Sequence, residues 1–335
     1  MKRILIIACI TLIHWAAFAQ VKQVDAIGFT VKDMNRSVKF YSEVLGFKKI
    51  SDKLVSGAAY ENLQGLFGLQ MRIVRLKLGD ECIELTDYLT AGGRSIPEDQ
   101  HSNDLFFQHI AIVVSNMEKA FQQLQKHNIE FVSTAPQTLP VTNLAAAGIK
   151  AFYFHDPDNH NLELIYFPKG KGQPKWQQQN GKLFLGIDHT AIGVSNTADS
   201  HRFYHDILGI DKKGESWNKG TEQEHLNNVA GASLHITGYR AAKGPGIEFL
   251  EYLAPGPGRP YPADSRTDDC WHWQTTLIVK NIAQLYKQLQ SENYKILSSQ
   301  LVQLHTPDGK IANAFIVRDQ DGHAMLLMEE LPQTP

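Results

Sequence analysis

The chain has 335 residues, of which 43% are hydrophobic and 20% are charged, and its formal net charge is -2. This length and composition predict a globular protein with about two domains and exclude a disordered chain. The nearly neutral charge gives no electrostatic reason to expect nucleic acid or an anionic membrane surface as a partner.

The first residues have the pattern of a secretory signal peptide. Lys2 and Arg3 make a basic start, residues 4–13 are almost all apolar, and Ala17-Phe18-Ala19 offers a cleavage site of small residues. An uncleaved membrane anchor is the alternative, but the apolar run is too short to cross a bilayer comfortably. We therefore expect residues 1–19 to be removed and the mature chain to be periplasmic or secreted, without membrane attachment.

The rest of the chain consists of two copies of one pattern. The apolar run that opens at Asp25 returns at Asp188, and each run is followed by a helix-like segment. Both segments end in the sequence Phe-Tyr-x-x-x-Leu-Gly, at Phe40–Gly46 and at Phe203–Gly209. A repeat of this length indicates that each half builds the same set of elements.

Each half divides again into two units, each with a strand, a helix and further strands. In the second unit of the first half, spacing and composition predict a strand, a helix and two more strands. These are residues 107–114, 117–127, 151–154 and 162–167. A turn at Asp156–His160 joins the last two strands, and its counterpart ends at His323. We expect His160 and His323 to support these turns.

The repeat predicts the domain organisation. A first domain covers residues 22–168 and a second covers 183–332, each with two of the four units, and residues 169–182 form a linker rich in Lys, Gly, Gln and Pro. The mature chain keeps Cys82 and Cys270, which do not occupy equivalent positions in the repeat. We expect two buried, unpaired thiols.

The fourfold pattern resembles the vicinal oxygen chelate superfamily, which includes glyoxalases, extradiol dioxygenases, fosfomycin-resistance proteins and bleomycin-binding proteins. Two motifs carry the resemblance: the Phe-Tyr-x-x-x-Leu-Gly helix end and the Asp-Pro-Asp-Asn-His-x-Leu-Glu turn and strand at Asp156–Glu163. The resemblance implies an α+β fold of four βαβββ modules. These form two glyoxalase-like domains whose curled mixed sheets surround a cavity. Neither motif specifies a reaction.

The resemblance also implies where metal ligands lie, at the start of each module's first strand and on its last strand. Carried onto this sequence, the second and third modules keep both ligands: His109 with Glu163, and His189 with Glu248. The first and fourth modules do not: these positions hold Ala26 with Glu84, and Gln274 with Leu326.

Two ways of pairing the modules remain open. If the second module pairs with the third, one cavity contains His109, Glu163, His189 and Glu248, and the other lacks a complete ligand set. If the modules pair in chain order, Glu84 joins His109 and Glu163 in one cavity. The concentration of intact ligand pairs in the two central modules favours the first arrangement.

The residue types support a metal independently of the resemblance. A carboxylate in an apolar strand is costly to bury without a partner, and a divalent cation removes that cost. Imidazole and oxygen ligands without thiolates suit one Zn, Mn, Fe, Ni or Co ion. Glu163 and Glu248 are also the candidate catalytic residues, because a glutamate beside a metal can act as a general base.

Candidate substrate-binding residues lie at the module starts. Phe107, Trp271 and Trp273 are expected to line a wall for a planar substrate, with core packing as the alternative. Arg94 and Arg259, in related Gly- and Pro-rich loops, are expected to clamp an acidic group.

These features lead to two functional hypotheses. The first is an exported, metal-dependent enzyme with glyoxalase-like isomerase, lyase or hydrolase chemistry, acting on a small substrate that chelates through two neighbouring oxygens. The second is a metal-free protein that binds a small molecule, as bleomycin-resistance proteins do, and the eroded positions in the outer modules motivate it. An extradiol dioxygenase is disfavoured because the fourth module lacks the ligand pair. Either protein acts as a monomer or homodimer.

Overall fold

The computed structural model describes residues 20–90, 92–178, 181–307 and 309–332. The predicted signal peptide, residues 1–19, lies outside the described residues. Within the described part of the chain, no helix is both long and apolar enough to cross a membrane.

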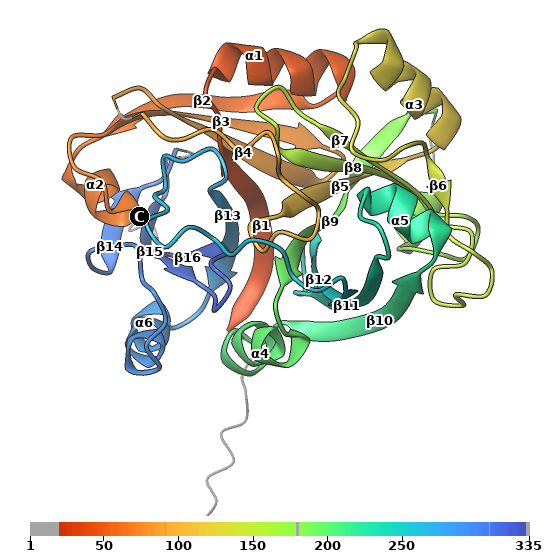
Figure 1. Cartoon of the computed structure of the whole chain (residues 1–335). Coiled ribbons are helices and arrows are strands. Elements are labelled where there is room, and N and C mark those ends of the chain that lie inside the picture. The colour runs from red at the N-terminus through yellow and green to blue at the C-terminus, as the bar shows by residue number, and fades with distance from the viewer. Residues whose placement is uncertain (1–19, 91, 179–180, 308, 333–335) are drawn as a thin grey trace, which may run out of the picture.

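The strands form two mixed sheets of eight strands each, which lie next to each other in Figure 1. The first, which we call the outer-module sheet, has the order β14-β15-β16-β13-β1-β4-β3-β2 and joins the first module to the fourth. Its strands are β1 (Val21–Thr30), β2 (Lys48–Ser56), β3 (Gln70–Leu78), β4 (Glu81–Tyr88), β13 (Trp273–Val279), β14 (Val302–His305), β15 (Ile311–Arg318) and β16 (Ala324–Glu330).

The second, which we call the central-module sheet, has the order β10-β11-β12-β9-β5-β8-β7-β6 and joins the second module to the third. Its strands are β5 (Gln108–Val114), β6 (Gln137–Thr138), β7 (Lys150–His155), β8 (Asn161–Tyr166), β9 (Phe184–Val194), β10 (Asp211–Lys219), β11 (Ser233–Arg240) and β12 (Gly246–Ala254). The preferred pairing of the central modules is thereby confirmed, and the pairing in chain order is wrong.

Most of the helices cover the outside of the sheets (Figure 1), but those at Ala58–Gln64 and Thr221–Asn227 supply residues to the cavity walls. They are α1 (Met34–Lys39), α2 (Ala58–Gln64), α3 (Met117–Lys126), α4 (Thr197–His201), α5 (Thr221–Asn227) and α6 (Ile282–Ser291). Local sequence explains their starts: the Asn116 side chain accepts a hydrogen bond from the Lys119 backbone N–H at 2.8 Å and caps α3. The buried residues Met117, Ala120 and Leu124 then follow with helical spacing.

The two largest hydrophobic clusters lie mainly within the two halves of the chain. One is built mostly from the first two modules, such as Ile27, Phe40 and Phe152, with Ile187 and Trp273 from the second half. The other is built mostly from the last two modules, including Phe203 and Leu285. Two smaller clusters instead lie within the sheets, one joining the first module to the fourth and one joining the second to the third. The domain limits predicted from the repeat remain a prediction.

The two sequence motifs contact each other, which explains why they occur together. Short π-helical turns, η1 (Phe40–Val44) and η3 (Arg202–Ile207), continue α1 and α4. Gly46 then adopts a φ of 76°, a left-handed conformation that favours glycine. The Tyr41 hydroxyl donates to Asp156 at 3.0 Å, and Asp156 contacts the His160 ring at 3.0 Å.

The second half repeats this arrangement. The Tyr204 hydroxyl donates to Asp319 at 3.0 Å, and His323 Nδ1 lies 3.2 Å from the same carboxylate. His160 and His323 are completely buried and support their turns, as expected from the sequence. Cys82 and Cys270 are buried free thiols, which also agrees with the prediction.

Candidate metal centre

The four predicted ligands converge on one face of the central-module sheet. His109 Nε2 lies 3.2 Å from Glu163 Oε2, and His189 Nε2 lies 3.6 Å from the same oxygen. Glu248 Oε2 lies 3.4 Å from His189 Nε2. These residues come from the adjacent strands β5, β8, β9 and β12, so one cavity contains ligands from both halves of the chain.

The strand register explains this convergence. In the antiparallel pair of β5 and β9, Ala111 stands opposite His189 and Ala191 opposite His109. The parallel neighbours place Glu163 beside Ala111 and Glu248 beside Ala191. Side chains that face each other across neighbouring strands share a face of the sheet. Two small alanines at the centre therefore leave room for four long polar side chains around them.

Three of the four imidazole nitrogens of His109 and His189 are buried without a hydrogen-bond partner among the described residues. His109, Glu163 and His189 are 1%, 5% and 6% exposed. Within the described residues, neither ring nitrogen of His109 makes a hydrogen bond, and Nε2 of His189 makes none. Buried polar atoms without partners are costly and uncommon. Two imidazoles and a carboxylate, with their ligand atoms within 4.8 Å of one another, are a donor set that fits a divalent cation.

Burial and the neighbouring carboxylates have opposite effects on the pKa of His189. Burial by itself lowers the pKa of His189, but the Glu248, Asp188 and Glu163 carboxylates outweigh it and raise that pKa to about 9. Burial raises the pKa of Glu248, and the Glu163 carboxylate adds to this effect against the opposing effect of His189. The site thus concentrates negative charge that a cation would neutralise.

The site opens into a cavity of about 470 Å³, a size that suits a small molecule. Glu163, His189 and Glu248 lie in its wall. Apolar side chains, including Leu139, Ile149, Leu226, Ile236 and Leu250, line part of the cavity. Polar and charged side chains, including Lys213, Glu215, Asn218, Gln223 and Arg240, line other parts. The cavity therefore offers both apolar and polar contacts around the candidate ligands.

This geometry agrees with the comparison of the chain with known protein families. The Glyoxalase/Bleomycin resistance protein/Dioxygenase superfamily matches the chain twice, over residues 23–164 and 186–327. The chain belongs to this superfamily. A glyoxalase I from Saccharomyces cerevisiae is 28% identical over 197 residues, which are 54% of this chain and 54% of the yeast protein. This chain therefore aligns with about half the length of that relative.

Two further comparisons concern an enzyme sequence and a solved structure. A 2-epi-5-epi-valiolone epimerase from Actinomyces sp. is 29% identical over 167 residues, which are 48% of this chain and 87% of the epimerase. The crystal structure of glyoxalase I from Zea mays superimposes with a TM-score of 0.59 at 15% identity, over 92% of each chain. At that identity, the structural likeness shows the fold.

The candidate metal centre includes residues that orient its ligands and that were not predicted from the sequence. His189 Nδ1 lies 3.1 Å from Asp188 Oδ2, which orients the ring. Trp176 Nε1 donates to Asp188 Oδ1 at 2.5 Å, and Arg240 pairs with Oδ2 at 2.5 Å. Trp176 lies in the predicted linker, within the short helical turn η2 (Pro174–Gln177), and is 5% exposed. Trp176 of the predicted linker thus packs beside the site. In the sequence, only the adjacent Asp188 and His189 indicated this support.

A prediction about the linker follows. Trp176→Phe keeps an aromatic ring but removes the donor to Asp188, so His189 loses part of its orientation. We expect the zinc affinity of the cavity to fall about tenfold, the magnitude typical of a lost supporting contact. Equilibrium competition with a chromophoric chelator measures this. Trp217→Phe, at a residue that is 58% exposed, is the control, and equal affinities in both variants would contradict the role.

The predicted arginine clamps are wrong for this cavity. Arg94 Nη2 pairs with Asp269 at 2.8 Å, and Arg259 Nη2 pairs with Asp104 at 2.7 Å. Neither arginine is in the cavity wall. Each joins a loop of one half to the other half, and each carboxylate is almost completely buried. The two symmetric pairs hold the halves together.

Phe107, Trp271 and Trp273 do not form the predicted aromatic wall. Trp273 lies in the first core, with its ring 4.4 Å from that of Phe29. Trp271 donates to Ser265 at 2.8 Å in a separate small cluster. Phe107 is closer to the site, with its ring 5.5 Å from the His109 ring, but it packs in a buried cluster with Tyr153 and is not in the cavity wall. Core packing, the alternative interpretation, is what the structure shows for the tryptophans.

Glu84 lies in the outer-module sheet, so it does not join His109. A cavity of about 380 Å³ contains Glu84 together with Gln274 and Leu326, and no histidine lines its described part. Arg75 lies in its wall and pairs with Asp25 at 2.7 Å. This cavity is the counterpart of the metal centre without its imidazoles.

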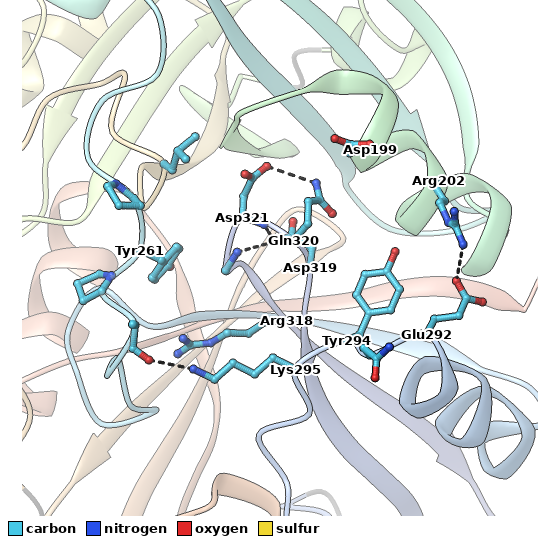
Figure 2. A pocket seen from close by; sticks show the side chains of 16 residues that line it. Asp199, Arg202, Tyr261, Glu292, Tyr294, Lys295, Arg318, Asp319, Gln320 and Asp321 are labelled. Carbon is cyan, nitrogen blue, oxygen red and sulfur yellow. Dashed lines mark hydrogen bonds and ion pairs between the residues drawn. The ribbon is translucent and has the colours of Figure 1, made fainter.

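A third pocket is larger in volume than either cavity and lies apart from both. Figure 2 shows this pocket of about 680 Å³ between the third and fourth modules. Its polar residues are largely paired with each other: Arg202 with Glu292 at 3.0 Å, and Gln320 with Asp321 at 3.3 Å. It contains none of the four predicted ligands. The types of donor atom that line the central-module cavity, and not the pocket volume, therefore single it out as the candidate metal centre.

Proposed function

We propose that the central-module cavity is the active site of a metal-dependent enzyme that moves a proton at carbon beside a carbonyl. The observation that carries this proposal is the pair of buried Nε2 atoms, of His109 and His189, without hydrogen bonds around one carboxylate. The substrate class is a small molecule with two neighbouring oxygens. The epimerase among the relatives supports it, since its name describes a rearrangement of a small molecule.

The four residues take different roles in this proposal. His109, His189 and Glu163 would hold the cation, because Glu163 Oε2 lies within 3.6 Å of both imidazoles. The chemistry that a bound cation supplies is Lewis-acid polarisation of a substrate oxygen. Glu248 joins the ligand set, and its side chain is 28% exposed against 6% for Glu163, so a substrate reaches it more readily.

Glu248 is therefore the general base. Its carboxylate accepts the proton from the substrate carbon and returns it to the neighbouring carbon on the same face. Burial raises the pKa of Glu248, which makes the carboxylate a stronger base than an exposed glutamate. Glu163, the other predicted catalytic residue, serves as a ligand in this scheme.

Two measurements on the purified mature chain test the proposal. Metal analysis should find a divalent ion bound in the cavity, and the chain should catalyse deuterium uptake from D₂O into small α-hydroxy or vicinal dicarbonyl compounds, followed by NMR. Treatment with a chelator should stop the exchange. A chain that binds no added Zn, Mn, Ni, Co or Fe(II) would sink the proposal. All four ligands come from one chain, so a monomer is sufficient.

A metal-free binding function is the second candidate. The 380 Å³ cavity of the outer-module sheet favours it, because Leu326, Ile73 and Met328 give it apolar walls beside the charged Arg75. Chelation separates the two functions. A metal-free binding protein keeps its ligand after treatment with a chelator, whereas the enzyme loses turnover.

Export of the chain is part of the proposal and rests on the sequence pattern alone. Residues 1–19 would direct secretion and be cleaved before Gln20. Intact-mass analysis of the protein from its native host should give a chain that begins at Gln20. A full-length chain recovered from the cytoplasm would contradict export.

A further inference from the structure

A second group of metal-binding side chains lies on the third module, outside the cavity. His201 ends α4, and His205 and Asp206 follow in the π-helical turn η3. One ligand atom from each of the three lies within 4.8 Å of the other two. His201 Nε2 is 3.8 Å from Asp206 Oδ1, and the two imidazole rings stack with centroids 4.5 Å apart.

The hydrogen bonds determine which nitrogen of His205 is free. His205 Nδ1 lies 3.0 Å from the backbone carbonyl oxygen of Ile210. A carbonyl oxygen only accepts, so Nδ1 carries the hydrogen and Nε2 of the neutral ring keeps its lone pair. A histidine that donates from one nitrogen to a carbonyl and binds metal through the other is the usual arrangement in metal sites.

His201 is oriented in a similar way by a different strand. Its Nδ1 lies 2.7 Å from the hydroxyl of Tyr239 on β11, so its Nε2 faces Asp206. Burial, His205 and Lys212 lower the pKa of His201, against the opposing effect of Asp206. The side chains of His201 and Asp206 are 37% and 59% exposed, so an ion reaches them from solvent.

The fold itself does not require these residues. The equivalent positions in the first half of the chain are Val38, Ser42 and Glu43, and the same helix and π-helical turn form there. The stacked histidines are therefore an addition to the repeated architecture, and the first half supplies matched replacements for testing them.

We propose that His201, His205 and Asp206 form a second metal site, for a borderline transition metal such as Zn(II), Ni(II) or Cu(II). Two imidazole nitrogens and one carboxylate oxygen are the donors, and water fills the remaining positions. The site shares no residue with the cavity. A chain with both sites filled holds two ions. A metal analysis that finds two ions per chain is therefore consistent with one ion in the cavity and one in the second site.

The test is a calorimetric titration of the metal-free mature chain with zinc chloride, comparing wild type with His205→Ser, which installs the residue of the first half. We expect His205→Ser to bind one zinc ion fewer, or to bind the ion of this site at least about a hundredfold less tightly, because a ligand is lost. Zinc should also raise the melting temperature of wild type more than that of the variant.

Two further variants complete the design. His201→Val, the other replacement taken from the first half, should reproduce the loss, and His127→Ala, at an exposed histidine on the second module, should bind zinc as wild type does. An unchanged number of zinc ions and unchanged affinities in His205→Ser would overturn the proposal. If the cavity binds no metal, wild type shows one binding event instead of two, and His205→Ser removes that event. Failure of the cavity site and failure of the second site therefore give different titrations.

Discussion

Replacing His189 with alanine is expected to abolish metal binding in the cavity. His189 Nε2 faces both Glu163 and Glu248, so its loss removes one of two imidazoles and leaves two carboxylates to repel each other. Loss of a supporting contact typically costs 10–100-fold in metal affinity, and loss of a ligand should cost at least about a hundredfold. Zinc titration in the His205→Ser background measures the cavity alone.

Glu84→Ala is the matched control for this variant. Glu84 occupies the position in the first module that Glu248 occupies in the third, but it lies in the outer-module sheet. We expect its removal to leave zinc affinity unchanged. The assignment of the site would fail if Glu84→Ala removed the cavity metal while His189→Ala retained it.

Replacing Glu248 with glutamine is expected to stop proton transfer while metal remains bound. The amide keeps the size and one oxygen of the side chain but cannot accept a proton from carbon. General base catalysis typically contributes 10²–10⁴-fold, so we expect the rate of deuterium exchange to fall about a thousandfold. NMR measures the exchange, and metal analysis of the same sample shows whether the ion is retained.

Two comparisons make the Glu248→Gln result interpretable. Glu84→Gln should exchange at the wild-type rate, because that carboxylate lies in the other cavity. Glu163→Gln should lose metal affinity as well as activity, since Glu163 lies within 3.6 Å of both imidazoles. An active Glu248→Gln with metal bound would show that Glu248 is not the base.

The repeated local motifs could be predicted from the sequence for physical reasons that act within a few residues. The left-handed conformation at Gly46 and Gly209 ends the helix in each half, and glycine adopts it without steric cost. Alternating apolar residues indicated the strands, and the repeat showed which histidines and glutamates occupy equivalent positions. The ligand types and their membership of two particular modules were thus readable from sequence.

The roles of Arg94, Trp271 and Trp273 were not readable in this way. A loop arginine looks the same whether it awaits a substrate or pairs with Asp269, which is far away in the sequence. The choice depends on which loops of the two halves meet. The same applies to Trp176, whose bond to Asp188 exists because the linker folds back onto β9.

The sequence by itself determined the four modules, the ligand pairs His109 with Glu163 and His189 with Glu248, and the types of atom they offer. Only the tertiary structure decided that β5 pairs with β9, which unites those ligands in one cavity. Backbone hydrogen bonds between strand edges are nearly independent of sequence, so the edge of β5 does not specify its partner. The partner is chosen by the packing of all four modules together, a property that no single segment contains.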